Sequence, residues 1–203
     1  MSKSKDKAVV GEPIGIFEDF KEEITLENVQ NSVFGTCVHN IFAACPSKGE
    51  EPTEAERSEF VSITRDILQN YELEGAVKDP AKLAHSLYAL YDYLKKEYGP
   101  ATGIVHEYPF NFPVPDSMKT VDGQVMKGEI DLIWQTEEGD IVVDFKNNMG
   151  DIAGLNTPGA GNYAGNHYVH QLRAYRSILE NAGHQVRATL LYYDILGVVV
   201  PID

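Results

Sequence analysis

The sequence stretches GEIDLIW (residues 128–134) and DIVVDFK (residues 140–146) decide the fold. Both are short runs rich in β-branched and other apolar residues, which is typical of β-strands. The residues between them, which include Glu137 to Gly139, have the composition of a turn. We therefore expect a β-hairpin over about residues 124–147, inside a larger sheet.

Charged residues interrupt both strands of this hairpin. Because side chains alternate faces along a strand, Asp144 and Lys146 share one face of the second strand. A turn centred near Glu138 places Asp131 opposite residue 145 or 146, give or take one. Asp144 directly follows three β-branched residues, and this run predicts a buried strand. Two carboxylates and a lysine are thus predicted to meet on neighbouring strands.

This combination favours a metal site over separate structural roles. An Asp beside a turn usually caps or is solvated, and a Lys on a strand edge usually opposes aggregation. Two carboxylates held close together repel each other unless a cation lies between them. Their hard oxygen ligands suit Mg²⁺, with Mn²⁺ as a substitute. Lys146 adds the positive charge that phosphoryl chemistry requires.

The half of the chain before the hairpin is mainly helical. Apolar residues recur at helical spacing over residues 31–45. Thr53 begins a capping box that opens a second helix, and a third helix runs from Pro80 until Gly99 stops it. We expect a helical subregion over about residues 50–99.

The rest of the chain alternates between strand and helix patterns. Strands are predicted over residues 104–114, 186–193 and 197–202, and a helix over residues 167–181. The sequence therefore predicts an α/β fold with a mixed central sheet, flanking helices and a helical N-terminal half.

The bulk composition fits one compact domain. The chain has 203 residues, of which 43% are hydrophobic, and we expect a flexible tail or linker over residues 1–12 and a single domain over residues 13–203.

The opening residues lack the apolar stretch of a secretory signal, and no segment has the apolar length that spans a bilayer. A cytoplasmic protein without membrane contact is expected. Two cysteines are too few for a four-cysteine zinc or iron-sulfur site.

The net charge of −14 argues against strong unaided binding to DNA, since such affinity comes largely from Lys and Arg. Much of the negative charge is local, because Glu50 to Glu74 contains eight acidic residues against Arg57 and Arg65. We interpret this segment as a solvated or partner-facing helical surface, which does not exclude DNA chemistry.

Four motifs in order resemble the PD-(D/E)xK nuclease superfamily in its RecB and AddA branch. The branch has a G-x-x-x-H helix followed by G-x-hydrophobic-D, D-aromatic-K and Q-L-x-x-Y, and the matching stretches here are VFGTCVHNIF, GEIDLIW, VVDFK and HQLRAY. They span residues 35–175. Ile130 stands where the strict family label has proline, as is usual in this branch. The resemblance implies a restriction-endonuclease-like core with a catalytic hairpin.

The resemblance also implies roles for single residues. Asp131 and Asp144 would bind the metal, with His39 as a further ligand. The backbone carbonyl of Phe145 would complete the protein's share of the shell. Lys146 would orient or help deprotonate the attacking water and stabilise the charge that develops on the phosphate.

Further residues near these motifs are candidates for supporting roles. Gln171 and Tyr175, spaced i and i+4 on one helix face, would position the substrate strand or the lysine. Gly35, one turn before His39, would leave room beside that ligand. Glu107, on the strand before the hairpin, would join the metal shell through a water.

The function that the resemblance implies is a Mg²⁺-dependent DNA exonuclease of recombination and repair. It would act on single strands or DNA ends, delivered by a helicase domain or subunit. The chain lacks the G-x-x-x-x-G-K-[ST] motif of an ATP motor. Two alternatives stay open: a non-catalytic DNA-binding or scaffold module with a nuclease fold, and a stand-alone endonuclease.

Overall fold

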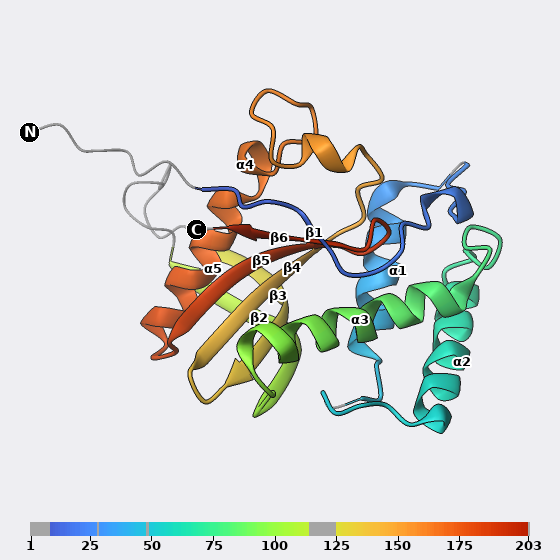
Figure 1. Cartoon of the computed structure of the whole chain (residues 1–203), viewed down its shortest axis with the longest axis horizontal. Helices are drawn as coiled ribbons and strands as arrows, with labels where there is room; N and C mark the ends of the chain where they lie inside the picture. The colour runs from blue at the N-terminus through green and yellow to red at the C-terminus, as the bar shows by residue number, and fades with distance from the viewer. Residues whose placement is uncertain (1–8, 28, 48, 114–124, 203) are drawn as a thin grey trace, which may run out of the picture.

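A mixed sheet in the order β1-β6-β5-β4-β3-β2 forms the centre of the protein (Figure 1). The computed structural model describes residues 9–27, 29–47, 49–113 and 125–202. Within this part of the chain the strands are β1 (Ile14–Gly15), β2 (Gly103–Pro113), β3 (Val125–Thr136), β4 (Gly139–Lys146), β5 (Val186–Tyr193) and β6 (Val198–Ile202). β4 and β5 pair in parallel, and the other neighbours are antiparallel.

Helices cover both faces of this sheet. Figure 1 shows three of them gathered at one side: α1 (Asn31–Ala43), α2 (Glu54–Asn70) and α3 (Pro80–Tyr98). The short α4 (Ala164–His167) and α5 (Val169–Asn181) connect the parallel strands, as a parallel pair requires a crossover. The predicted α/β fold with a helical N-terminal half is confirmed, and the architecture is that of a restriction-endonuclease-like core.

The predicted starts of two helices are confirmed by their capping contacts. The Glu56 backbone N–H donates to Thr53 Oγ1 at 3.2 Å, and the Thr53 N–H donates to Glu56 Oε2 at 2.8 Å. Asp79 Oδ1 caps α3 by accepting from the Ala81 N–H at 3.0 Å. Gly99 ends α3 with a φ of 99°, a conformation that favours glycine.

Two hydrophobic cores lie on opposite faces of the sheet. The larger core packs α1, α2 and α3 against side chains of β3, β4 and β5, among them Trp134, Val143 and Tyr192. The smaller core packs α5 against the other face, through Leu172 and Leu179. Strands buried on both faces explain the nearly continuous apolar runs of β4 and β5.

Several boundaries differ from the sequence prediction. β1 was not predicted, since two residues carry no periodicity and Ile14 becomes a strand residue only by pairing with Val199. The helix predicted over residues 167–181 divides at Tyr168 into α4 and α5. Short 3₁₀ helices at Lys21–Glu23 and Ile152–Gly154 were also not predicted.

Several predicted segments have an end outside the described residues, among them the strand predicted over residues 104–114 and the domain predicted over residues 13–203. Residues 1–8 of the predicted tail lie outside the described residues too, whereas Gly11 donates its backbone N–H to the Pro201 carbonyl at 2.8 Å. The predicted start of the hairpin at residue 124 also lies outside them. None of the described helices has both the length and the apolar character needed to cross a bilayer.

The central strands β3 and β4 separate part of the way along their length. Their ladder ends at Leu132 opposite Val143, while β3 stays paired with β2 and β4 stays paired with β5 as far as Lys146. The next residues along the register are Asp131 and Asp144. The sheet therefore opens at these two carboxylates.

The larger core should dominate the stability of the fold. Leu87 on α3 is fully buried, so Leu87→Ala is expected to lower the free energy of unfolding by about 2–5 kcal/mol. Lys96→Ala, at an exposed position of the same helix, should change it by less than about 0.5 kcal/mol. Urea denaturation measures both, and equal effects would contradict this assignment of the core.

Candidate metal centre and active site

The hairpin brings Asp131 and Asp144 to the opening between β3 and β4. The turn is centred between Glu137 and Glu138, so Asp131 lies opposite Asp144 when the ladder is extended. This is one residue from the predicted position, 145 or 146, and inside the stated margin. Both aspartates are buried, with 6% and 1% of their surface exposed.

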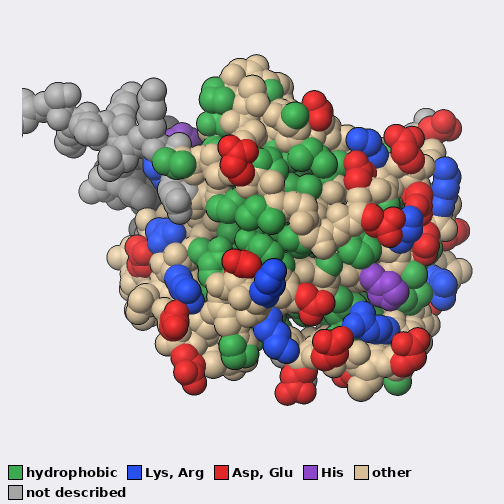
Figure 2. Space-filling view, viewed as in Figure 1, with side chains coloured by type: hydrophobic (Ala, Val, Ile, Leu, Met, Phe, Trp, Pro, Cys, Tyr) green, Lys and Arg blue, Asp and Glu red, His purple; other side chains and the backbone are tan. Residues whose placement is uncertain are grey.

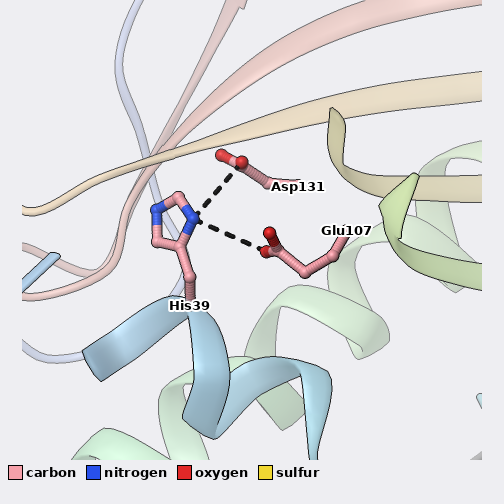
Figure 3. A group of neighbouring side chains, drawn as sticks. All are labelled: His39, Glu107 and Asp131. Carbon is pink, nitrogen blue, oxygen red and sulfur yellow. Dashed lines mark ion pairs between the residues drawn. The ribbon is translucent and has the colours of Figure 1, made fainter. Parts of the chain in front are cut away.

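α1 contributes a histidine to the same opening. Figure 3 shows His39 extending from α1 toward Asp131 on β3 and Glu107 on β2. His39 Nδ1 lies 3.3 Å from Asp131 Oδ1 and 3.5 Å from Glu107 Oε1. One ligand atom from each of the three residues lies within 4.8 Å of the others, a spacing that one metal ion could bridge.

Glu107 holds an unusual backbone conformation at this site. Its φ is 49°, and the β2–β3 ladder is interrupted between His106 and Tyr108. A left-handed residue other than glycine inside a strand is strained, and such strain collects at functional sites. The predicted role of Glu107 was indirect, through a water, yet its carboxylate lies directly beside His39.

Lys146 lies among several polar and aromatic groups. Its ammonium pairs with Asp144 Oδ2 and lies 4.5 Å from the centre of the Tyr168 ring. It also donates to Gln171 Oε1 at 3.5 Å, and the Gln171 amide donates to the Tyr175 hydroxyl at 2.6 Å. α5 thus brings the predicted pair Gln171 and Tyr175 to the lysine.

Phe145 joins the two sides of the opening. Its backbone N–H donates to Asp131 Oδ2 at 2.6 Å, which fixes that carboxylate against β4. Its ring packs edge-on against His39 and Phe42, at 5.6 and 5.1 Å between ring centres. The role of the Phe145 carbonyl as a metal ligand stays a prediction.

Burial and neighbouring charges shift the ionisation of the acidic residues. Burial, together with the charge of Asp144, raises the pKa of Asp131 to about 7. Burial also raises the pKa of Asp144, although the Lys146 ammonium opposes this shift. For His39, burial lowers the pKa, but the hydrogen bond to Glu107 and the charge of Asp131 outweigh it and raise the pKa overall. These carboxylates need a positive partner to be ionised together.

Sequence reasoning missed two further contacts around this centre. No local pattern places the Tyr168 ring against the Lys146 ammonium. Asp194 is fully buried, and its Oδ2 accepts a hydrogen bond from the Asn147 amide at 2.7 Å. Asp194 follows the apolar strand β5 directly, as Asp144 follows its own apolar run, and this signal was available in the sequence.

Gly35 lies against the same asparagine. A Cβ at Gly35 would lie 2.9 Å from Asn147 Oδ1, closer than side chains tolerate. The room expected beside His39 is therefore filled by a side chain from the end of β4.

Buried carboxylates thus lie beside a lysine and a histidine at the opening between β3 and β4, and three of these residues could hold a metal ion. The sequence matches the family model of the PD-(D/E)XK nuclease superfamily over residues 18–199. The chain belongs to this superfamily, whose members are divalent-metal nucleases. No curated protein matches the chain.

The raised pKa of Asp131 predicts how the stability of the metal-free protein depends on pH. The unfolded pKa of an aspartate is about 4. Because the folded pKa lies near 7, the folded protein binds this proton more tightly, and stability falls as pH rises from 4 through 7. Asp131→Asn removes this effect. In EDTA the variant should therefore melt at a higher temperature than the native protein at pH 8, and the difference should shrink toward pH 4.

Calorimetry at several pH values measures this difference. Asp66→Asn makes the same chemical change at an exposed position of α2 and should show no pH-dependent difference from the native protein. If the native protein instead melts at a higher temperature than Asp131→Asn at pH 8, the ionised Asp131 carboxylate does not destabilise the folded protein.

Proposed function

We propose that this chain is a Mg²⁺-dependent DNA exonuclease of the RecB/AddA-like type, with Asp131, Asp144 and Lys146 at its catalytic centre. One observation carries the proposal. His39, Glu107 and Asp131 bring their ligand atoms within 4.8 Å of one another, beside the Asp144–Lys146 ion pair, in a chain of the nuclease superfamily.

The donor atoms at this site fit a hard divalent cation. Glu107 Oε1 and Asp144 Oδ2 are buried, and apart from their ion pairs with His39 and Lys146 neither accepts a hydrogen bond within the described part of the chain. Buried carboxylate oxygens without hydrogen-bond donors are costly unless a cation satisfies them. Carboxylate oxygens with one imidazole suit Mg²⁺ or Mn²⁺, whereas a thiolate is missing from the cluster.

Four residues would hold the ion in this proposal. They are His39, Asp131, Asp144 and, through its backbone carbonyl, Phe145; Glu107 is a further candidate. When bound, a divalent ion supplies Lewis-acid polarisation of a phosphoryl oxygen and a water of lowered pKa. The bond between the Phe145 N–H and Asp131 would keep that carboxylate in place during binding.

Lys146 would act on the attacking water and on the phosphate. Asp144 and Gln171 constrain its ammonium, and Tyr175 in turn holds the Gln171 amide. A lysine fixed in this way would orient or help deprotonate the water and stabilise the negative charge that develops on the phosphate. Gln171 and Tyr175 are therefore positioning residues in the proposal.

The surface charge supports a substrate that a partner delivers. On the face drawn in Figure 2, Asp and Glu side chains lie among Lys and Arg, and the described residues there form no broad basic patch. With a net charge of −14, the chain is expected to bind DNA weakly alone. We therefore include a helicase domain or subunit that feeds single strands or DNA ends, in recombination and repair. A cytoplasmic location belongs to the same proposal.

The first test is cleavage of end-labelled single-stranded and duplex DNA with Mg²⁺, with Mn²⁺ and with EDTA. The native protein should degrade DNA only with metal, and Lys146→Ala should lower the rate constant by about 100-fold or more, because it removes the stabilising charge. Lys96→Ala, at an exposed position of α3, should cleave like the native protein.

The outcome separates the enzyme from a non-catalytic module. Cleavage that survives Lys146→Ala would refute the assigned centre. A native protein that binds DNA but cleaves it with neither metal would favour the scaffold alternative, and calorimetry with Mn²⁺ would then test whether the site binds metal at all.

A second test concerns the dependence on ends. An exonuclease should degrade linear single-stranded DNA and leave covalently closed circles of the same sequence intact over the same time. Agarose gels of both substrates with Mg²⁺ measure this difference. Cutting of the closed circles at a comparable rate would identify a stand-alone endonuclease instead.

A further inference from the structure

We propose that Asn147 and Asp194 form a positioning pair that sets the distance between His39 on α1 and the Asp144–Lys146 pair on β4. The inference rests on the proposed metal-dependent function. It assigns a role to two residues that contact neither the ion nor the substrate in that proposal.

The pair continues the sheet where its backbone ladder stops. The last parallel pair of β4 and β5 is Lys146 with Tyr193. The next residue on each strand, Asn147 and Asp194, is joined to the other by its side chain, with 2.7 Å between Asn147 Nδ2 and Asp194 Oδ2. The strand end that carries Lys146 is therefore held one residue beyond the regular ladder.

Asp194 is held at both of its side-chain oxygens. It is fully buried, and its other oxygen, Oδ1, accepts the Ile195 backbone N–H at 2.7 Å. Both carboxylate oxygens are thus used within the protein. Burial of a carboxylate is costly, and the cost is reduced when hydrogen bonds compensate it in one fixed geometry.

Asn147 also touches the helix that carries His39. Its Oδ1 fills the space where Gly35 would otherwise carry a Cβ, at 2.9 Å from that position. Gly35 lies one helical turn before His39. One asparagine side chain therefore contacts α1 on one side and Asp194 on the other, directly after Lys146.

This geometry transmits any shift of Asn147 to the metal ligands. A displaced Asn147 moves the end of β4 against α1, and so changes the distance from His39 to the Asp144–Lys146 pair. Residues that orient metal ligands commonly affect metal affinity or activity by about 10- to 100-fold when mutated.

The test exchanges the donor and the acceptor of the pair. Asn147→Asp removes the amide donor to Asp194 Oδ2, puts a second acidic group in its place, and should weaken Mn²⁺ binding by about 10- to 100-fold. The double variant Asn147→Asp with Asp194→Asn restores one donor and one acceptor with their roles exchanged, and it should recover native affinity to within a few-fold. Isothermal calorimetry with Mn²⁺ measures all three proteins, and circular dichroism checks that each is folded.

Two further variants separate positioning from other effects. Asn148→Asp adds the same charge one residue along the chain, keeps its acceptor for the Gly150 N–H, and should bind Mn²⁺ like the native protein. Gly35→Ala pushes on Asn147 from the helix side and should weaken binding as Asn147→Asp does, which tests the proposal even if Asn147→Asp fails to fold. In DNA cleavage the weakened variants should lose kcat with KM nearly unchanged.

The outcomes distinguish this inference from the proposed function. Native Mn²⁺ affinity in folded Asn147→Asp or in Gly35→Ala, or a folded double variant no better than Asn147→Asp, would overturn the positioning role while leaving the nuclease proposal standing. Mn²⁺ binding by the native protein without any DNA cleavage would instead favour the scaffold alternative over the proposed function, and the affinities of the variants would still decide the role of the pair.

Discussion

The burial of Asp131 and Asp144 side by side is the constraint on which the rest of the site depends. Both carboxylates are buried at the point where β3 leaves β4, and burial together with the charge of Asp144 raises the pKa of Asp131 to about 7. Such a pair is stable in its ionised form only beside positive charge. The protein supplies His39 from one face of the sheet and Lys146 on the other, and in our proposal a divalent cation adds to them.

Each neighbouring element has a definite part in holding this pair. α1 carries His39, and the Phe145 ring packs on that histidine while the Phe145 N–H binds Asp131. α5 brings Gln171 to the lysine. The sheet is therefore covered on both faces for two reasons: helices bury its apolar strands, and they also deliver side chains to the opening. The strained φ of Glu107 belongs to the same arrangement.

Membership of the PD-(D/E)XK nuclease superfamily and the acidic surface are compatible when binding and chemistry are considered separately. Affinity for DNA grows with basic surface, whereas hydrolysis needs carboxylates that hold a cation. A chain with few basic residues can have the carboxylates for hydrolysis without a high affinity for DNA if another protein or domain supplies the strand. The helicase partner in our proposal rests on this separation of roles.

The sequence by itself determined the α/β class, the three N-terminal helices and the hairpin, because periodicity, capping residues and turn residues act over a few neighbours along the chain. The ordered motifs also pointed to Asp131, Asp144, Lys146 and His39 as one site. Only the tertiary structure decided that Glu107 lies beside His39, and that Asn147 joins Asp194 and Gly35. These contacts join residues far apart in sequence, and they depend on how β3 and β4 separate and how α1 packs, which no local pattern encodes.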